Sequence, residues 1–193
     1  MSNYEVKHLD HLGLIAGFCD EIGLVEYIDE QFPLQPEEKE LSYGQCLLAM
    51  ILNGLGYTSQ TLYLQSEYFS DKPVDKLLGE GITAEHINDY VLGRSLDKFF
   101  DYGVSDLYMG LADKVVNHLG LTVESQHLDS TSFHVDGRYE GYEDENCIQL
   151  VKGYSRDHRP ELNQAVLNLI VENQANIPLY MKPSSGNSVD KSG

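Results

Sequence analysis

The sequence has little positive charge. It contains 13 Lys and Arg residues against 31 Asp and Glu residues, which gives a net charge of −18. A protein that binds a nucleic-acid backbone by displacing its counterions needs clustered basic side chains. The composition therefore argues against this chain holding DNA or RNA by itself through charge.

Cysteine is scarce and long apolar runs are absent. The three cysteines, Cys19, Cys46 and Cys147, stand far apart without a CxxC pair, which argues against a zinc site or a disulfide framework and favours three small core residues. No stretch approaches the roughly 18 apolar residues of a membrane span, and MSNYEVKHLD does not resemble a signal peptide. We therefore expect a protein of the reducing cytoplasm that does not contact a membrane.

What the sequence does contain is enough apolar material for a core. Hydrophobic residues make up 41% of 193 residues, as in ordinary globular proteins. From about residue 9 to residue 120 they recur at three- and four-residue spacing, which is typical of helices. Gly23 predicts the end of a first helix, and the Phe32–Pro33 junction predicts the end of a second, because a residue before proline disfavours helical geometry.

Helix-start signals continue along this part of the chain. Ser42 and Gln45 have the spacing of a capping box, and the apolar segment CLLAMILNGLGY behind them predicts a helix buried on most sides. Thr83 and Ser105 are further predicted N-caps, and Gly120 closes the last helical stripe. Residues 1–120 are thus predicted to form one helical domain.

After residue 120 the pattern changes. The segment LTVESQHLDSTSFHVDG is rich in Val, Thr and Phe and predicts a strand that runs into a turn. Residues 160–173 fit two structures: a helix entered at Pro160, or the first strand of a hairpin formed by AVLNLIV, the polar ENQAN and IPLYMK. The pattern alone leaves both open, and the tail PSSGNSVDKSG is predicted to be a loop.

Asp129 lies within the predicted strand after residue 120, where a buried carboxylate must be paired, metal-bound or neutralised. A carboxylate on a strand is a ligand for Mg²⁺ or Mn²⁺. Two-metal phosphoryl transfer, however, needs at least two converging carboxylates. On the residues alone we favour an aspartate that is hydrogen-bonded to Ser130, Thr131 or a turn.

Asp129 belongs to one of two HxD pairs in this segment. His127 with Asp129, and His134 with Asp136, have a spacing that places each pair on one face of a strand. One hypothesis is a metal-dependent hydrolase that uses His127, Asp129 and His134. The plainer interpretation, which we favour, places His134 and Asp136 near a turn in solvent.

A short basic segment interrupts the acidic chain. GYSRDHRPEL contains Arg156, His158 and Arg159, which can contact phosphate groups. Equally, the segment can be a loop whose arginines pair with Asp157 and Glu161. Both interpretations stay open at this point.

Longer segments carry a more specific signal. HLDSTSFHVDGRYEGY, followed by GYSRDHRPELNQAVLNLIVENQANIPLYMKPSSGNSVDKSG, resembles the start of the catalytic domain of bacterial insertion-sequence transposases of the DDE, ribonuclease-H-like superfamily, in the group with a Tyr-Arg-Glu-Lys signature. The upstream segments GLVEYIDEQF, LNGLGYTSQTLYLQSEYF and AEHINDYVLGRSLDKFFDYG are similar to a helical N-terminal domain of unknown function that some of these transposases carry. The resemblance covers essentially the whole chain, and GYSRDHRP with PSSGNSVD is more specific than Asp129 alone.

The resemblance implies a fold and a site. The fold is α+β: an all-helical N-terminal domain, residues 1–120, and then the first three antiparallel strands of a ribonuclease-H-like domain, residues 121–193. Asp129 matches the first catalytic carboxylate and would bind Mg²⁺ or Mn²⁺ for DNA cleavage and strand transfer at insertion-sequence ends. Arg156, His158 and Arg159 would lie on the DNA side, and QAVLNLIVE and IPLYMK would be the second and third strands.

The sequence also departs from the family pattern. The second and third carboxylates are expected beyond Gly193, and Asp190 does not match either of them. We therefore expect a truncated transposase that is inactive alone, because one missing group of a catalytic set removes most activity. The alternative is a non-catalytic helical module that pairs with full-length transposase and regulates it; an exposed sheet edge also predicts self-association.

Overall fold

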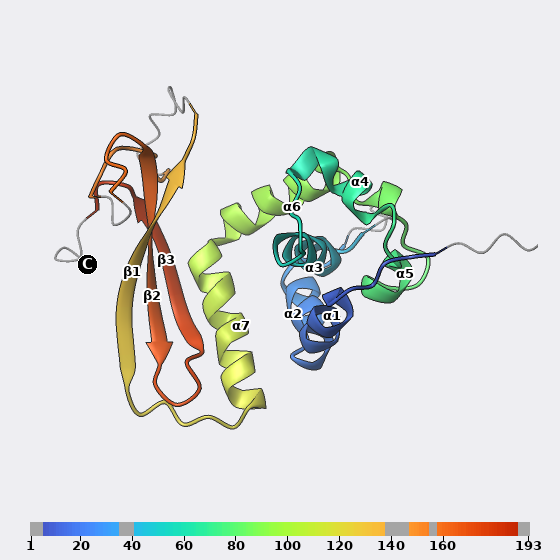
Figure 1. Ribbon diagram of the computed structural model, residues 1–193. Helices are drawn as coiled ribbons and strands as arrows, with labels where there is room; N and C mark the ends of the chain where they lie inside the picture. Colours follow the sequence, from blue (N-terminus) through green and yellow to red (C-terminus); the bar gives the residue numbers. More distant parts are fainter. Residues whose placement is uncertain (1–5, 35–40, 138–146, 155–157, 189–193) are drawn as a thin grey trace, which may run out of the picture. The chain divides into compact units, whose positions relative to one another are not determined.

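The computed structural model describes residues 6–34, 41–137, 147–154 and 158–188 (Figure 1). The chain divides into two compact units, Met1–Tyr102 and Gly103–Gly193. The first is helical, and the second combines a helix with a three-stranded antiparallel sheet. The predicted α+β class is therefore confirmed.

The helical unit is built around one central helix. Helix α3 contacts α1, α2 and α6, and its residues Cys46, Ala49 and Leu52 are fully buried. The elements of this unit are α1 (Leu12–Glu21), α2 (Leu24–Gln31), α3 (Tyr43–Gly54), η1 (Leu62–Leu64), α4 (Gln65–Phe69), α5 (Val74–Leu77), η2 (Ala84–His86) and α6 (Asp89–Tyr102). Cys19 is buried as well, whereas Cys147 in the other unit is half-buried.

The local signals at the ends of the first helices act as predicted. Gly23 has φ +64° and separates α1 from α2, and the C-cap of α2 is Phe32, the residue before Pro33. The Ser42 hydroxyl accepts the Gln45 N–H at 3.1 Å, and the Gln45 side-chain oxygen accepts the Ser42 N–H at 2.9 Å. The capping box of α3 is therefore confirmed.

Of the two further predicted N-caps, one is confirmed. Thr83 is the N-cap of the short η2 turn, and its N–H donates to the His86 Nδ1 atom at 3.2 Å. Helix α6 begins at Asp89, where the Asn88 side-chain oxygen accepts the Val91 N–H at 3.1 Å. Ser105 lies inside the first turn of α7 (Val104–His118) instead of capping it. The cap is Gly103, whose φ of +101° is a conformation that glycine adopts without strain.

Helix α7 lies in the same compact unit as the sheet. It packs against β3, and the Tyr108 hydroxyl donates to the Pro178 carbonyl at 3.1 Å. The division between the units therefore falls after Tyr102, earlier than the expected boundary after residue 120. Sequence spacing showed that α7 is a helix, and Gly120 with φ +62° follows it as predicted, but the spacing could not show which elements bury its apolar face.

The sheet has the strand order β1-β2-β3, with β1 (Gln126–Val135), β2 (Asn163–Glu172) and β3 (Pro178–Ser185), and both pairs are antiparallel (Figure 1). Asp129 lies opposite Leu169 of β2, which lies opposite Met181 of β3. The hairpin interpretation of residues 160–173 is confirmed, and the helix interpretation is wrong.

The predicted loop PSSGNSVDKSG begins as a strand instead. Strand β3 continues to Ser185 and so includes Pro183. Proline lacks an N–H and is tolerated on an edge strand, which has a neighbour on one side only. Asp190 lies outside the described residues. No helix in the part of the chain that the structure describes is long and apolar enough to cross a membrane.

Candidate functional site

Asp129 lies near the middle of β1 and is exposed. Its Oδ1 atom accepts the N–H of Ser130 at 2.9 Å. Across the sheet, its neighbours in register are Leu169 and Met181, which bring no oxygen or nitrogen ligand to its side. The carboxylate thus has the local hydrogen bond that the residues alone predicted, and burial does not force it to find a counter-ion.

The surroundings of Asp129 do not by themselves fit a divalent cation. Mg²⁺ and Mn²⁺ are held by several oxygen ligands. Within the described residues, no three His, Cys, Asp or Glu side chains are placed to hold a metal ion together. A site with three such side-chain ligands at Asp129 would need residues from outside the described part of the chain.

The HxD hydrolase hypothesis is wrong for the described residues. His127 and Asp129 share one face of β1, but His134 has the opposite parity and lies on the other face. The His127 Nε2 atom donates to the Asn173 side-chain oxygen at 3.0 Å. His127 therefore holds the end of the β2–β3 hairpin, and the three proposed ligands do not converge.

A polar row crosses the other face of the sheet. The buried Ser130 hydroxyl donates to Asn168 Oδ1 at 2.7 Å, and Asn168 Nδ2 donates to the Ser184 hydroxyl at 3.3 Å. One asparagine on β2 thus connects all three strands. Each such bond contributes about 0.5–1.5 kcal/mol to stability, so the row fixes the strand register.

Gln164, at the start of β2, is 1% exposed. Its Nε2 atom donates to the carbonyls of Tyr154, at 3.1 Å, and Gly186, at 2.8 Å. Gly153 passes so close that a Cβ atom there would lie 2.8 Å from the Gly186 carbonyl carbon. Gly153 and Tyr154 from the run GYSRDHRP therefore meet Gly186 from the run PSSGNSVD around one buried amide.

Glu172, at the end of β2, is also 1% exposed. Its carboxylate accepts the backbone N–H groups of Ile177 (2.8 Å), Ala175 (2.7 Å) and Gln174 (2.5 Å). These bonds, first that of Ile177, lower the pKa of Glu172 below its usual value, although burial acts in the opposite direction. The carboxylate closes the β2–β3 hairpin.

Sequence reasoning missed these polar residues of β2. Gln164, Asn168 and Glu172 are spaced by four, which on a strand places all three on one face. The signal was present in NQAVLNLIVENQ as polar positions at even spacing within an apolar run. This spacing places the three side chains on one face only if the segment is a strand, and the sequence pattern alone also allowed a helix.

The basic segment is described in part. Arg156 and Asp157 lie outside the described residues, and His158 is exposed with φ +57°. Arg159 forms an ion pair with Glu161, whose carboxylate raises the pKa of Arg159. For Arg159, this is the pairing that the second interpretation predicts; DNA contact by Arg156, His158 and Arg159 stays a prediction.

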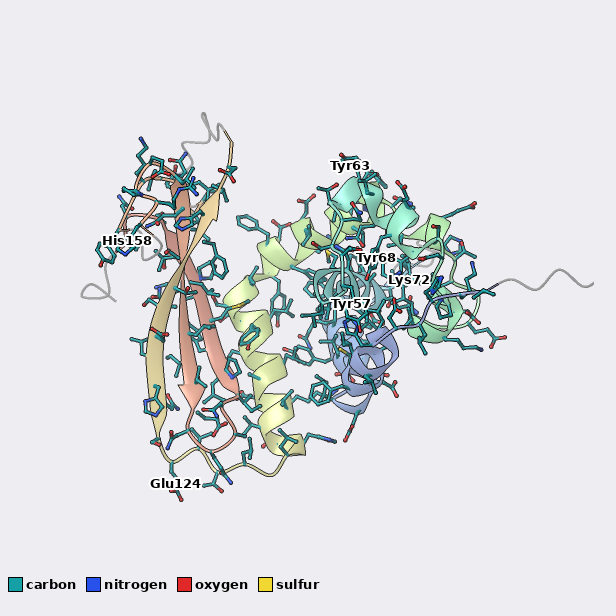
Figure 2. The ribbon with its side chains drawn as sticks, in the orientation of Figure 1. Tyr57, Tyr63, Tyr68, Lys72, Glu124 and His158 are labelled. Carbon is teal, nitrogen blue, oxygen red and sulfur yellow. The ribbon has the colours of Figure 1, made fainter. Side chains whose placement is uncertain are left out.

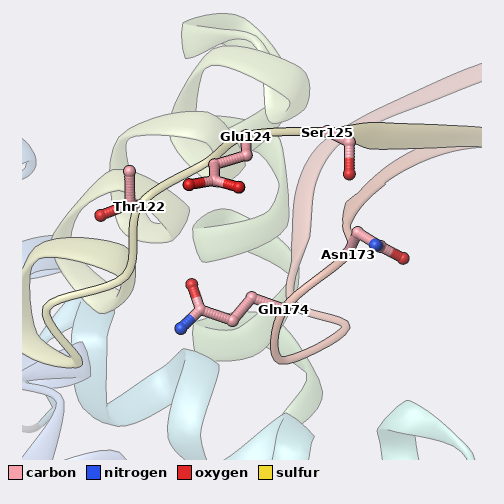
Figure 3. A pocket seen from close by; sticks show the side chains of 5 residues that line it. All are labelled: Thr122, Glu124, Ser125, Asn173 and Gln174. Atoms are coloured by element: carbon pink, nitrogen blue, oxygen red, sulfur yellow. The ribbon is translucent and has the colours of Figure 1, made fainter.

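A polar pocket of about 440 Å³ lies in the second unit (Figure 3). It is bounded by the connection from α7 to β1 and by the β2–β3 turn, and its lining residues are Thr122, Glu124, Ser125, Asn173 and Gln174. The Asn173 N–H donates to the Ser125 carbonyl at 3.2 Å, which joins the two segments. None of the predicted site residues lines this pocket.

The helical unit has its own buried polar cluster (Figure 2). The Lys72 ammonium lies 4.6 Å from the centroid of the Tyr68 ring and 3.0 Å from the Asp71 carboxylate. The hydrogen bond from Lys72 lowers the pKa of Asp71, and burial raises the pKa of Tyr68. The Tyr68 hydroxyl donates to the Leu52 carbonyl at 3.2 Å, so this cluster ties α4 to α3.

The chain is an α+β protein with two units. The first unit is helical, and the second consists of a helix and a three-stranded antiparallel sheet with one carboxylate, Asp129, on its first strand. Residues 4–113, more than half of the chain, match the family described as "Domain of unknown function (DUF4277)". The chain therefore belongs to this family. The match covers the helical unit and most of α7 and ends before the sheet. No curated protein and no solved structure matches the chain.

Proposed function

We propose that the chain acts in DNA transposition in the bacterial cytoplasm, as part of an insertion-sequence transposase of the DDE group. One observation carries the proposal: Asp129 lies near the middle of the first of three consecutive antiparallel strands. That is the place of the first catalytic carboxylate in the domain that residues 121–193 resemble. The helical domain of unknown function precedes it, as it does in a subset of those transposases.

A second observation supports the same origin. The runs GYSRDHRP and PSSGNSVD carry the most specific part of the resemblance, and the structure gives their glycines a shared physical role. Gly153 and Gly186 approach each other beside the buried Gln164 amide. The glycines of the two runs that carry the resemblance therefore also pack together in this chain.

The proposal gives residues 1–193 no cleavage chemistry of their own. Phosphodiester cleavage by two metal ions needs two or three converging carboxylates, and within the described residues no three His, Cys, Asp or Glu side chains are placed to hold a metal ion together. Ligands for Mg²⁺ or Mn²⁺ would have to be added by other segments or subunits. The net charge of −18 and the Arg159–Glu161 ion pair likewise suggest that other surfaces hold most of the DNA.

The first test is nicking of an insertion-sequence end by the purified chain with Mn²⁺. We expect no cleavage by folded residues 1–193, because a single carboxylate does not assemble the metal site. Cleavage that disappears in Asp129→Ala would show that the chain completes its site by itself or with a second copy. That result would overturn the proposed dependence on additional carboxylates.

The second test asks whether Asp129 has the proposed role. Residues 121–188 would replace the matching segment of a full-length transposase of this DDE group, and excision would be measured. We expect an active chimera in which Asp129→Asn lowers the rate by about 10³-fold or more, whereas Asp136→Asn, in the adjoining turn, leaves it close to the parent. Equal activity of both variants would exclude Asp129 as a metal ligand.

A second candidate is a non-catalytic module that binds full-length transposase and regulates it. The observation that favours it is on α1, where Leu14 and Phe18 are exposed one turn apart with Gly17 between them. Gel filtration of the chain with full-length transposase should then show a complex, and Leu14→Glu with Phe18→Glu should abolish it. The matched control Tyr63→Glu, at another exposed residue of the unit, should leave the complex intact.

A further inference from the structure

The pocket between the α7–β1 connection and the β2–β3 turn is lined by polar side chains only (Figure 3). They are one carboxylate, two hydroxyls and two amides: Glu124, Thr122, Ser125, Asn173 and Gln174. The Glu124 carboxylate and the Gln174 amide extend from opposite walls into the space between them. The volume of about 440 Å³ lies within the range of roughly 300–1,000 Å³ that is usual for ligand sites.

Hydrogen bonds hold both walls of this pocket. The Gln174 N–H donates to the buried Glu172 carboxylate at 2.5 Å, which fixes the turn. The Asn173 N–H donates to the Ser125 carbonyl at 3.2 Å, and the Asn173 side-chain oxygen accepts from His127 Nε2 at 3.0 Å. The two walls are therefore joined before a ligand arrives, so that binding does not have to order them.

Glu124 supplies the one formal charge among the lining residues. It is exposed, and no side chain in the described part of the chain forms an ion pair or a hydrogen bond with its carboxylate. An ionised carboxylate has two oxygens that accept hydrogen bonds and donates none. The pocket therefore favours a ligand that is positively charged and carries N–H or O–H donors.

The lining also limits which ligand fits. An anion would be repelled by Glu124, and no Lys or Arg among the lining residues would offset this. A divalent metal ion prefers several charged or carbonyl oxygens, and across residues 6–34, 41–137, 147–154 and 158–188 no three His, Cys, Asp or Glu side chains are placed to hold one. A cation with a single charge and several donors fits better.

The guanidinium group has these properties. It is planar, matches a carboxylate with two parallel hydrogen bonds, and is more weakly hydrated than an ammonium group. We propose that the pocket binds a guanidinium group such as that of an arginine side chain, with Glu124 as its bidentate partner. The Gln174 side-chain oxygen accepts from a further N–H, and the net charge of −18 attracts the cation over a longer range.

This site is separate from the proposed role in transposition, because neither the ligand nor its test involves DNA. The ¹⁵N-labelled full chain would be titrated with N-acetyl-arginine amide, whose one charge is the guanidinium group, and followed by NMR. We expect saturable shifts of the backbone amides of residues 122–125 and 173–174 that fit one site. N-acetyl-lysine amide should bind about fivefold more weakly, because an ammonium group does not form the paired bonds.

Matched variants test the role of the carboxylate. Glu124→Gln keeps the size of the side chain and should weaken binding by at least about tenfold, because charge-assisted hydrogen bonds are the stronger kind. Glu85→Gln removes the same charge from an exposed residue of the helical unit and should leave the affinity within about twofold, because salt screens distant charges. Gln174→Lys places a cation opposite Glu124 and should abolish binding. Circular dichroism would verify that each variant is folded.

Two further ligands distinguish the source of the guanidinium group. A peptide with blocked ends and a single arginine between glycines that binds at least as tightly as N-acetyl-arginine amide identifies an arginine side chain of a protein segment. Tighter binding of free L-arginine than of either compound identifies a small guanidinium compound, whose other charged groups then add contacts.

Three results would overturn the proposal. The first is the absence of saturable shifts at residues 122–125 and 173–174 in the folded wild-type chain. The second is equal binding by wild type and Glu124→Gln, or an equal loss in Glu124→Gln and Glu85→Gln, which would reduce the effect to net charge. The third is equal binding of the arginine and lysine compounds, which would remove the assignment to guanidinium.

Discussion

The helical unit and the sheet unit are stabilised by different means. Most of the fully buried apolar side chains in the described chain lie within residues 1–102. Outside that unit the described core consists of Leu107, Ala112, Val115 and Val166. The sheet unit buries the polar residues Ser130, Gln164 and Glu172 beside this small apolar core, whereas the buried polar residues of the helical unit, such as Lys72 and Ser95, lie beside a much larger one.

This difference has a consequence for where function is sought. Apolar burial is non-directional and stabilises a unit that needs no partner. Hydrogen-bonded polar rows fix geometry but add little net free energy each. In the sheet unit, polar hydrogen bonds across the strands therefore contribute a larger share of the contacts that fix the fold, and its first strand β1 carries Asp129.

The largest expected effect tests the apolar side of the comparison. Leu52 is fully buried in α3, so Leu52→Ala should lower the free energy of unfolding by about 2–5 kcal/mol. Leu128→Ala, on the exposed side of β1, should change it by no more than about 0.5 kcal/mol. Urea unfolding followed by circular dichroism measures both, and equal losses would show that Leu128 is buried in solution.

A smaller effect concerns the approach of two helices. A Cβ atom at Gly44 would lie 2.8 Å from the Val25 Cα atom, so Gly44→Ala should destabilise the helical unit by about 1–3 kcal/mol. Gly17, inside α1, has no atom within 4 Å of such a Cβ atom, and Gly17→Ala should stabilise the unit by up to about 1 kcal/mol. The two variants form a matched pair for thermal unfolding, and the same sign for both would refute the packing argument.

The smallest effect is specific to the sheet and depends on pH. The folded pKa of Glu172 is lowered, so its contribution to stability is complete above the unfolded pKa of about 4.3 and is lost as the pH falls through the lower folded value. Glu172→Gln should therefore be less stable than wild type at neutral pH and should approach it in acid. The control Gln174→Ala keeps the backbone N–H that donates to Glu172, so its melting temperature should depend on pH as that of the wild type does. A difference in melting temperature between Glu172→Gln and wild type that does not change with pH would contradict this role of Glu172.

Much of the helical unit could be predicted because its signals are local. The Ser42–Gln45 box, Gly23 and the Phe32–Pro33 junction each act through atoms a few residues apart. Ser105 misled because a serine inside the first turn and a serine at the cap look alike in sequence. The backbone conformation of Gly103 decided between them.

The sheet could be predicted only in part because its determinants are distant in sequence. Residues 160–173 fitted a helix and a strand equally until the resemblance favoured the hairpin. Pro183 suggested a loop because its tolerance depends on lying at an edge. Gln164 and Glu172 are buried by segments on either side of β2, which no local pattern reveals, and the role of Asp129 stays a prediction.

The close packing of Gly153 and Gly186 beside Gln164 limits which substitutions this sequence can accept during evolution. A methyl group at either glycine would collide with a neighbouring backbone, and loss of the amide would remove the hydrogen bonds to the buried Gly186 carbonyl and to the Tyr154 carbonyl. A substitution at one of these three positions therefore disrupts contacts that a second substitution at the other two positions does not restore. Distant relatives that share this end of the sheet should be recognisable by that trio even after the remaining positions have diverged.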